Sequence, residues 1–156
     1  MKKEIEQKFL VRSDEYKLLA KEKLYIRQAY LDFCPSLTVR VRIKDGKGFL
    51  TLKNKSKDGG LSRDEWEREI PVAEAEELIN KMAKGYVVEK WRYRVPWNGK
   101  IIEVDEFLSP RKALVLAEIE WDSLDEARQK HDLPAWLGEE VTGRPEYYNA
   151  YMAQYG

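Results

Sequence analysis

Charged and apolar residues alternate with a period of two through most of this chain, a pattern typical of β-strands with one polar and one apolar face. Turn residues separate the alternating segments, and Asp45-Gly46 and Asn98-Gly99 are dipeptides that accept the positive φ angles of tight hairpins. The pattern predicts about eight strands, mostly antiparallel. Their expected bounds are 3–11, 24–33, 37–44, 48–54, 62–70, 87–95, 101–108 and 114–122.

Three amphipathic segments predict helices that pack against this sheet. The clearest spans 74–84 and carries one apolar stripe. A second begins at Ser123, because Glu126 three residues later completes a capping box, and a third carries the tyrosines near the C-terminus. The polar, Gly-rich stretch 54–60 predicts a mobile loop between strands and not an interdomain linker. We therefore expect residues 1–156 to form one α+β domain that is predominantly β.

Charged residues share one face in strand after strand. Glu4, Glu6 and Lys8 alternate with Ile5 and Phe9, and about six of the predicted strands repeat this rule. A half-solvated sheet, with its charges facing water, explains any single strand of this kind. The repetition favours a closed barrel, in which the apolar face points outward under helices and the charges converge in the lumen.

Charges gathered in a lumen need partners, because each unpaired buried ion costs several kcal/mol. Inward bases suit a long phosphate-bearing anion, since Arg offers planar forks and Lys offers point charges. Inward carboxylates offer the hard oxygen ligands that Mg²⁺ and Mn²⁺ prefer, so the inventory predicts a metal and polyphosphate site. The bases are Lys8, Arg40, Arg42, Lys53, Lys90 and Arg92, and the acids are Glu4, Glu6, Glu65, Glu67, Glu103, Asp105, Glu118 and Glu120.

Composition and charge limit the kinds of molecule that the protein is expected to bind and the cellular compartment in which it is expected to work. Basic and acidic residues both number 28, so the generic electrostatic footprint of a nucleic-acid-binding protein is missing. No apolar run approaches the ~20 residues of a membrane-spanning helix, so no membrane association is expected. The single cysteine, Cys34, excludes an internal disulfide and fits the reducing cytoplasm. The single histidine, His131, is expected on the surface.

Glu4-Ile5-Glu6-Gln7-Lys8 matches the ExExK signature of the CYTH superfamily, the triphosphate tunnel metalloenzymes, and the chain resembles that family over nearly its whole length. The later alternating segments follow in the family's order: Val39-Arg40-Val41-Arg42, Thr51-Leu52-Lys53, Glu89-Lys90-Trp91-Arg92 and Ala117-Glu118-Ile119-Glu120. The resemblance implies an eight-stranded antiparallel tunnel. It also implies metal-dependent hydrolysis of a triphosphate, without a covalent intermediate, aided by two Mg²⁺ or Mn²⁺ ions.

The resemblance further assigns roles to individual side chains. The triphosphate is expected to be held by Lys8, Arg40, Arg42, Lys53, Lys90 and Arg92, with support from Arg63. The principal metal ligands are expected to be Glu4, Glu6, Glu118 and Glu120, which together with Lys8 form the predicted catalytic set. Glu65, Glu67 and Asp105 are further candidates for metal or water positioning, and Glu103 is a supporting charge. Many bacterial relatives carry a lysine on the final helix, where this chain reads Tyr147-Tyr148-Asn149-Ala150.

Trp66, Trp91 and Trp121 share the apolar parity and are expected in the core beneath helices, which leaves no aromatic side chain on the charged face to bind an organic group. This favours inorganic tripolyphosphate as the small-molecule substrate, cleaved to pyrophosphate and phosphate. The alternatives are a class IV adenylyl cyclase, a thiamine triphosphatase, and a polyphosphate- or nucleotide-binding module without turnover. A homodimer is left open.

Overall fold

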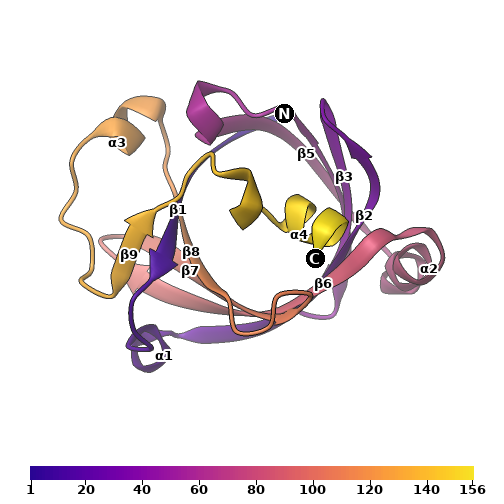
Figure 1. Ribbon diagram of the computed structural model, residues 1–156, viewed down its shortest axis with the longest axis horizontal. Helices are drawn as coiled ribbons and strands as arrows, with labels where there is room; N and C mark the ends of the chain where they lie inside the picture. The colour runs from indigo at the N-terminus through magenta and orange to yellow at the C-terminus, as the bar shows by residue number, and fades with distance from the viewer.

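Eight antiparallel strands close into a barrel in the computed structural model, which describes all 156 residues (Figure 1). The strands of the ring are β1 (Lys2–Val11), β2 (Glu22–Cys34), β3 (Leu37–Lys44), β4 (Lys47–Asn54), β5 (Ser62–Ile70), β6 (Lys84–Trp97), β7 (Lys100–Ser109) and β8 (Val115–Glu120), and a ninth strand, β9 (Leu137–Glu140), is added to β1. They follow the order β5-β4-β3-β2-β6-β7-β8-β1-β9, and an additional pairing of β5 with β1 closes the ring. The predicted closed barrel is therefore confirmed.

Strand β1 completes the barrel because its two ends use different neighbours. Residues from Lys2 to Ile5 pair with β5, and residues from Glu6 to Leu10 pair with β8. The short strand β9 then pairs with β1 beyond the end of β5. The sequence pattern missed β9, since only Leu137 of its four residues is buried and no alternation can develop over that length.

Four short helices pack against the barrel. They are α1 (Tyr16–Leu19), α2 (Val72–Met82), α3 (Leu124–Arg128) and α4 (Asn149–Tyr155), with 3₁₀ turns at Asp58–Gly60 and Pro145–Tyr147. The predicted capping box is present, since the Ser123 side chain accepts a hydrogen bond from the Glu126 N–H at the start of α3. None of the four helices is both long and apolar enough to cross a membrane.

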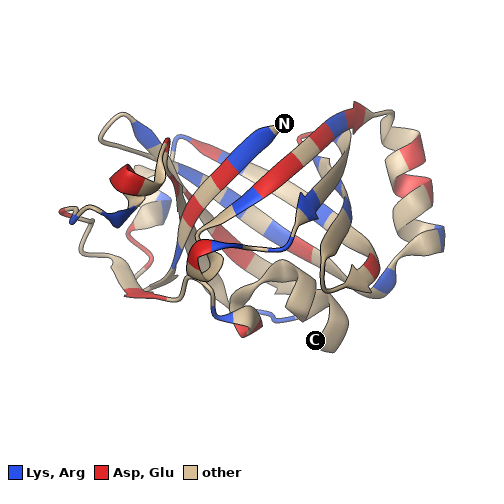
Figure 2. Ribbon diagram, turned by 90° about the horizontal axis from the view of Figure 1, so that it is seen from above, with Lys and Arg blue, Asp and Glu red and all other residues tan.

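Apolar side chains on the outer face of the barrel form its packed core, as the alternation predicted. One cluster lies under α1, α3 and β9 and includes Phe9, Val104 and Ile119. A second cluster lies under α2, which approaches β4 so closely that a Cβ at Gly48 would stand 2.7 Å from the Cβ of Ala75. Most of the opposite, inward positions are left to charged residues. Figure 2 shows Lys, Arg, Asp and Glu interspersed with other residues along the strands.

One end of the lumen is apolar, and α4 packs against it. Met152 and Ala153 of this helix are fully buried against the inward side chains of Val88, Phe107 and Leu116. In Figure 1, the helix lies within the outline of the ring of strands. The charged part of the lumen is consequently closed at this end by the C-terminal segment.

Candidate active site

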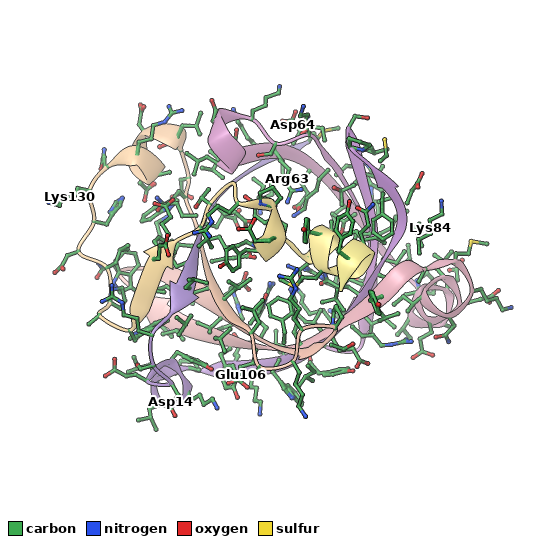
Figure 3. The ribbon with its side chains drawn as sticks, viewed as in Figure 1. Asp14, Arg63, Asp64, Lys84, Glu106 and Lys130 are labelled. Atoms are coloured by element: carbon green, nitrogen blue, oxygen red, sulfur yellow. The ribbon has the colours of Figure 1, made fainter.

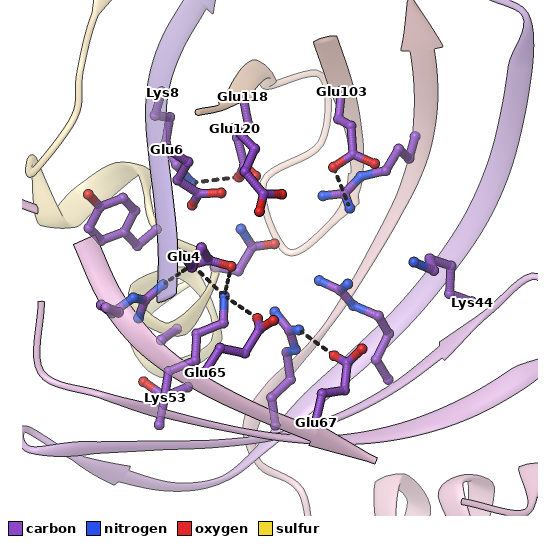
Figure 4. A pocket seen from close by; sticks show the side chains of 18 of the residues that line it. Glu4, Glu6, Lys8, Lys44, Lys53, Glu65, Glu67, Glu103, Glu118 and Glu120 are labelled. Atoms are coloured by element: carbon purple, nitrogen blue, oxygen red, sulfur yellow. Dashed lines mark hydrogen bonds and ion pairs between the residues drawn. The ribbon is translucent and has the colours of Figure 1, made fainter. Parts of the chain in front are cut away.

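Inward side chains line a cavity of about 190 Å³ inside the barrel (Figure 4). Nine of the lining residues are basic and seven are acidic. The basic residues are Lys2, Lys8, Arg40, Arg42, Lys44, Lys53, Arg63, Lys90 and Arg92, and the acidic residues are Glu4, Glu6, Glu65, Glu67, Glu103, Glu118 and Glu120. Every site residue expected from the sequence except Asp105 therefore lies on this cavity.

The six bases expected to hold a triphosphate are removed from bulk water. Their exposed fractions lie between 1% for Lys90 and 8% for Arg42. A half-solvated sheet would leave such side chains open to solvent, so the structure excludes that alternative. In Figure 3, Arg63 also lies inside the ring, whereas Lys84 and Lys130 project from its outside.

Lys53 and its carboxylate neighbours form a compact ionic group on β1, β4 and β5. Its Nζ lies 2.9 Å from an oxygen of Glu4 and 3.5 Å from one of Glu65, while Arg63 approaches Glu4 to 3.7 Å. Burial raises the pKa of Glu4, but Lys53 and Arg63 more than offset this and lower it to about 2. Burial and the nearby Glu4 raise the pKa of Glu65. Glu4 is therefore ionised at neutral pH.

Glu6 lies between Glu4 and Glu118 with no hydrogen-bonding or ion-pairing partner of its own. Glu118 instead pairs with Lys8 at 3.2 Å, which helps to hold its pKa well below the usual range against the effect of burial. Burial and repulsion from Glu118 and Glu4 raise the pKa of Glu6 to about 8. Glu6 is thus a buried carboxylate that has two carboxylate neighbours and no counter-charge of its own, an arrangement that a cation would relieve.

The chemistry of this donor set fits a hard divalent cation, although no three of the acidic, His or Cys side chains in the chain are arranged as a ready-made metal cluster. Glu4, Glu6, Glu118 and Glu120 could hold such an ion. Glu120 lies near the open end, where it also pairs with Lys2 at 2.8 Å. That end continues into a second cavity of about 440 Å³ beside the β6–β7 hairpin.

Asp105 is the one expected metal candidate that the cavity lining does not include. Both of its oxygens accept hydrogen bonds from Arg92, at 2.7 and 2.9 Å, and Lys90 lies 2.8 Å away. Although burial raises the pKa of Asp105, Arg92 and Lys90 lower it to about 2. Burial meanwhile lowers the pKa of Lys90 to about 7. Both Asp105 oxygens are thus engaged by cationic side chains in this structure.

Arg40 and Arg42 carry positive charge that the lumen carboxylates compensate only in part. The Nε of Arg40 is buried and has no hydrogen-bond acceptor, and its nearest carboxylate, on Glu67, is 3.7 Å from Nη2. Arg42 has no ion pair, and burial together with repulsion from Arg40 and Arg92 lowers its pKa to about 10. Buried donors that lack acceptors indicate a place for an anion.

Several lining residues were not anticipated from the sequence. Lys2, Tyr30 and Lys44 continue the inward parity of strands already identified and could have been found by extending it. Tyr148 and Asn149 come from the C-terminal segment, where no alternation exists. Two lumen-facing tyrosines correct the expectation that the charged face holds no aromatic side chain.

These tyrosines are already engaged by protein groups. The hydroxyl of Tyr30 accepts a hydrogen bond from Gln28, and the ring of Tyr148 lies 4.6 Å from the Nζ of Lys8. The predicted core position of the tryptophans holds for Trp121, which is buried, while Trp66 is half-buried under Arg68 instead of a helix. Trp91 is half-buried, packs against the apolar cluster beneath α1, α3 and β9, and lies beside Lys23.

The two residues judged incidental lie away from the lumen. Cys34 is exposed at the end of β2. His131 stacks on Trp121 on the outer side of the barrel, with ring centroids 4.2 Å apart. Neither takes part in the cavity.

Comparison with known proteins agrees with this geometry. The CYTH domain family matches residues 2–148. The chain is 46% identical to an inorganic triphosphatase of Acetivibrio thermocellus, over 99% of this chain and 95% of that protein, and 38% identical to one of Nitrosomonas europaea, over 96% of each. A crystal structure of an inorganic triphosphatase aligns with a TM-score of 0.65 and 35% identity, covering 98% of this chain and 95% of the other. The chain belongs to the CYTH domain family.

Proposed function

We propose that this protein is a metal-dependent inorganic triphosphatase that hydrolyses tripolyphosphate to pyrophosphate and phosphate. The observation that carries the proposal is the pairing, in one buried cavity, of nine basic residues with a partly uncompensated group of carboxylates. The bases suit a polyanion, and the carboxylates are explained by divalent cations that accompany it. The high identity to two inorganic triphosphatases supports the same substrate.

The basic side chains of the lumen would bind and orient the polyphosphate. Arg40 and Arg42 lack a full complement of acceptors and would donate to phosphate oxygens, while Lys8, Lys53, Lys90 and Arg92 would stabilise charge on the transferred phosphoryl group and on the leaving pyrophosphate. Because Arg92 and Lys90 are fixed by Asp105, they present their remaining donors in a defined direction. This preorganisation avoids reorganisation during the reaction.

Glu4, Glu6, Glu118 and Glu120 are the residues that would hold Mg²⁺ or Mn²⁺, as two ions, with Glu65 and Glu67 available at the edge of the group. When bound, the ions would polarise the phosphate oxygens and lower the pKa of the attacking water. The carboxylates themselves would fix the position of that water relative to the phosphorus. We assign Asp105 to positioning the bases.

The adenylyl cyclase and thiamine triphosphatase alternatives require a place for an organic group. The lumen tyrosines do not supply an obvious one, because Tyr30 is 3% exposed and Tyr148 packs against Lys8. A binding module without turnover would need the bases but would gain little from the carboxylates. These points favour hydrolysis of the inorganic substrate.

The test is to incubate the pure protein with tripolyphosphate, ATP or thiamine triphosphate in Mg²⁺ or Mn²⁺, with Glu6→Gln as control. Phosphate and pyrophosphate released from tripolyphosphate, and lost in the variant, are the expected result. Cyclic AMP from ATP would instead identify a cyclase. Binding of tripolyphosphate without any product would identify the non-catalytic module.

We also propose that residues 1–156 act as one unit in the cytoplasm. The single exposed thiol of Cys34 supports a reducing compartment. A homodimer is supported only by exposed Leu18 and Leu19 on α1, and size-exclusion chromatography with light scattering tests it.

A further inference from the structure

Two neutral amides connect two of the cationic side chains of the lumen. Arg42 Nε donates to Gln28 Oε1 at 3.1 Å, Gln28 Nε2 donates to Asn149 Oδ1 at 3.4 Å, and Lys90 Nζ donates to the same Asn149 oxygen at 2.9 Å. Gln28 Nε2 also donates to Tyr30 at 3.0 Å. The result is a continuous hydrogen-bonded bridge from β3 through β2 and the start of α4 to β6.

The cations at its two ends fix the orientation of both amides. An arginine Nε and a lysine ammonium group can only donate, so the oxygens of Gln28 and Asn149 must face Arg42 and Lys90 respectively. The NH₂ group of Gln28 is thereby directed to Asn149. The NH₂ group of Asn149 donates to no protein acceptor, and Asn149 lines the cavity, so it is available to a phosphate oxygen.

Neutrality distinguishes this bridge from the other contacts that hold lumen bases. Lys8, Lys53 and Arg92 are positioned by carboxylates, which offset their charge, and Lys90 has Asp105 at 2.8 Å in addition to Asn149. Arg42 has Gln28 as its hydrogen-bonding partner and no carboxylate within 4.0 Å. An amide supplies the directional hydrogen bond of a carboxylate but leaves the full positive charge for the ligand.

We propose that Gln28 and Asn149 are positioning and specificity residues, which orient Arg42 and Lys90 for a polyphosphate without adding any counter-charge of their own. The proposal rests on the proposed function for its ligand. Gln28 is fully buried and does not line the cavity, so it acts only through its neighbours. Asn149 lines the cavity and additionally donates its free NH₂ group to the phosphate chain.

Isosteric carboxylates test the bridge, because they keep its shape and change its charge. In Gln28→Glu, the new carboxylate would pair with Arg42, so the melting temperature should stay unchanged or rise while tripolyphosphate binds at least about tenfold more weakly. Asn149→Asp should weaken binding in the same way through Lys90. Gln28→Met removes the hydrogen bond without adding charge and should lower the melting temperature with a smaller loss of affinity.

Affinity is measured by calorimetry with tripolyphosphate in EDTA, and KM and kcat are measured with Mg²⁺. Asn80→Asp is the matched control, since Asn80 accepts a hydrogen bond from Arg27 at 2.9 Å on the exposed side of the barrel wall. A Gln28→Glu protein that binds tripolyphosphate as tightly as the wild type would overturn the proposal. The proposal would also be overturned if Gln28→Glu lost the same stability and the same affinity as Gln28→Met, because a purely structural role of Gln28 predicts equal losses. If Gln28→Glu does not fold, Asn149→Asp decides by the same criteria. Binding in EDTA is measured without turnover, so it tests the bridge even if the wild type hydrolyses nothing. Failure of the proposed function can therefore be distinguished from failure of this inference.

Discussion

Replacing Glu6 with Gln should stabilise the protein in the absence of metal and ligand, and the gain should grow as the pH rises. Glu6 has no ion-pair partner and lies among Glu4 and Glu118, which together with burial raise its pKa from 4.5 to about 8. Gln has nearly the same shape as a protonated Glu but cannot ionise. The substitution therefore removes the electrostatic penalty and little else.

The sign follows from proton binding. Between pH 4.5 and about 8, the folded protein keeps the Glu6 proton while the unfolded chain releases it, so the stability of the wild type falls as the pH rises through this window. At 1.36 kcal/mol for each pKa unit, the penalty approaches about 5 kcal/mol above pH 8. A domain of this size changes its melting temperature by about 2–4 °C per kcal/mol, so a gap of roughly 10–20 °C is expected at pH 8 and only a small one near pH 5.

Melting temperatures of wild type and Glu6→Gln should be compared from pH 5 to 9 in EDTA and a buffer without multivalent anions. Titrations common to both proteins cancel in the difference, and Glu76→Gln, on the exposed face of α2, serves as the matched control. Adding Mg²⁺ should stabilise the wild type more than the variant. A gap that does not change with pH, or a Glu6→Gln protein less stable than the wild type at pH 8, would refute the reasoning.

Three further outcomes are expected. Asp105→Asn leaves Lys90 and Arg92 buried without their shared counter-charge and should cost about 3–5 kcal/mol, measured by urea unfolding. Tripolyphosphate with Mg²⁺ should raise the melting temperature of the wild type, because a ligand at a hundred times its Kd stabilises the folded state by about 2.7 kcal/mol. The absence of a shift would contradict binding in the lumen. Gly143→Ala should destabilise more than Gly46→Ala in thermal unfolding. Both glycines have positive φ, but a Cβ at Gly143 would stand 2.1 Å from a backbone carbonyl of the facing loop, and one at Gly46 would meet nothing.

The barrel and most of its lining were predictable because side-chain parity alone decides which face of a closed sheet a residue occupies. An error in the predicted end of a strand does not change the face on which its residues lie. Strand β6 runs from Lys84 to Trp97, beyond the predicted 87–95, yet Lys90 and Arg92 still face the lumen. The family resemblance added the identity of the chemistry, which parity cannot supply.

The partner of Asp105 was not predicted, because parity gives a face but not a partner. The partner was nevertheless accessible through the hairpin at Asn98-Gly99, which sets Trp97 opposite Lys100. Counting five residues outward along each strand places Arg92 opposite Asp105, as the structure has it. Cross-strand neighbours of opposite charge pair readily, so register derived from the tight turn would have assigned this carboxylate to the arginine.

The C-terminal segment could not be placed in this way, because it reaches the lumen through contacts between residues more than a hundred positions apart. Lys8 Nζ donates to the carbonyl of Tyr147 at 3.1 Å, and the Lys8 N–H donates to Thr142. Asn149 meets Lys90 only because these contacts and the apolar packing of α4 fix where the helix begins. The barrel wall thus supplies the charges of the lumen together with Gln28, whereas the segment that closes one end adds Asn149. Differences in substrate preference among such barrels are therefore expected to follow residues such as Asn149, which alternation along strands does not reveal.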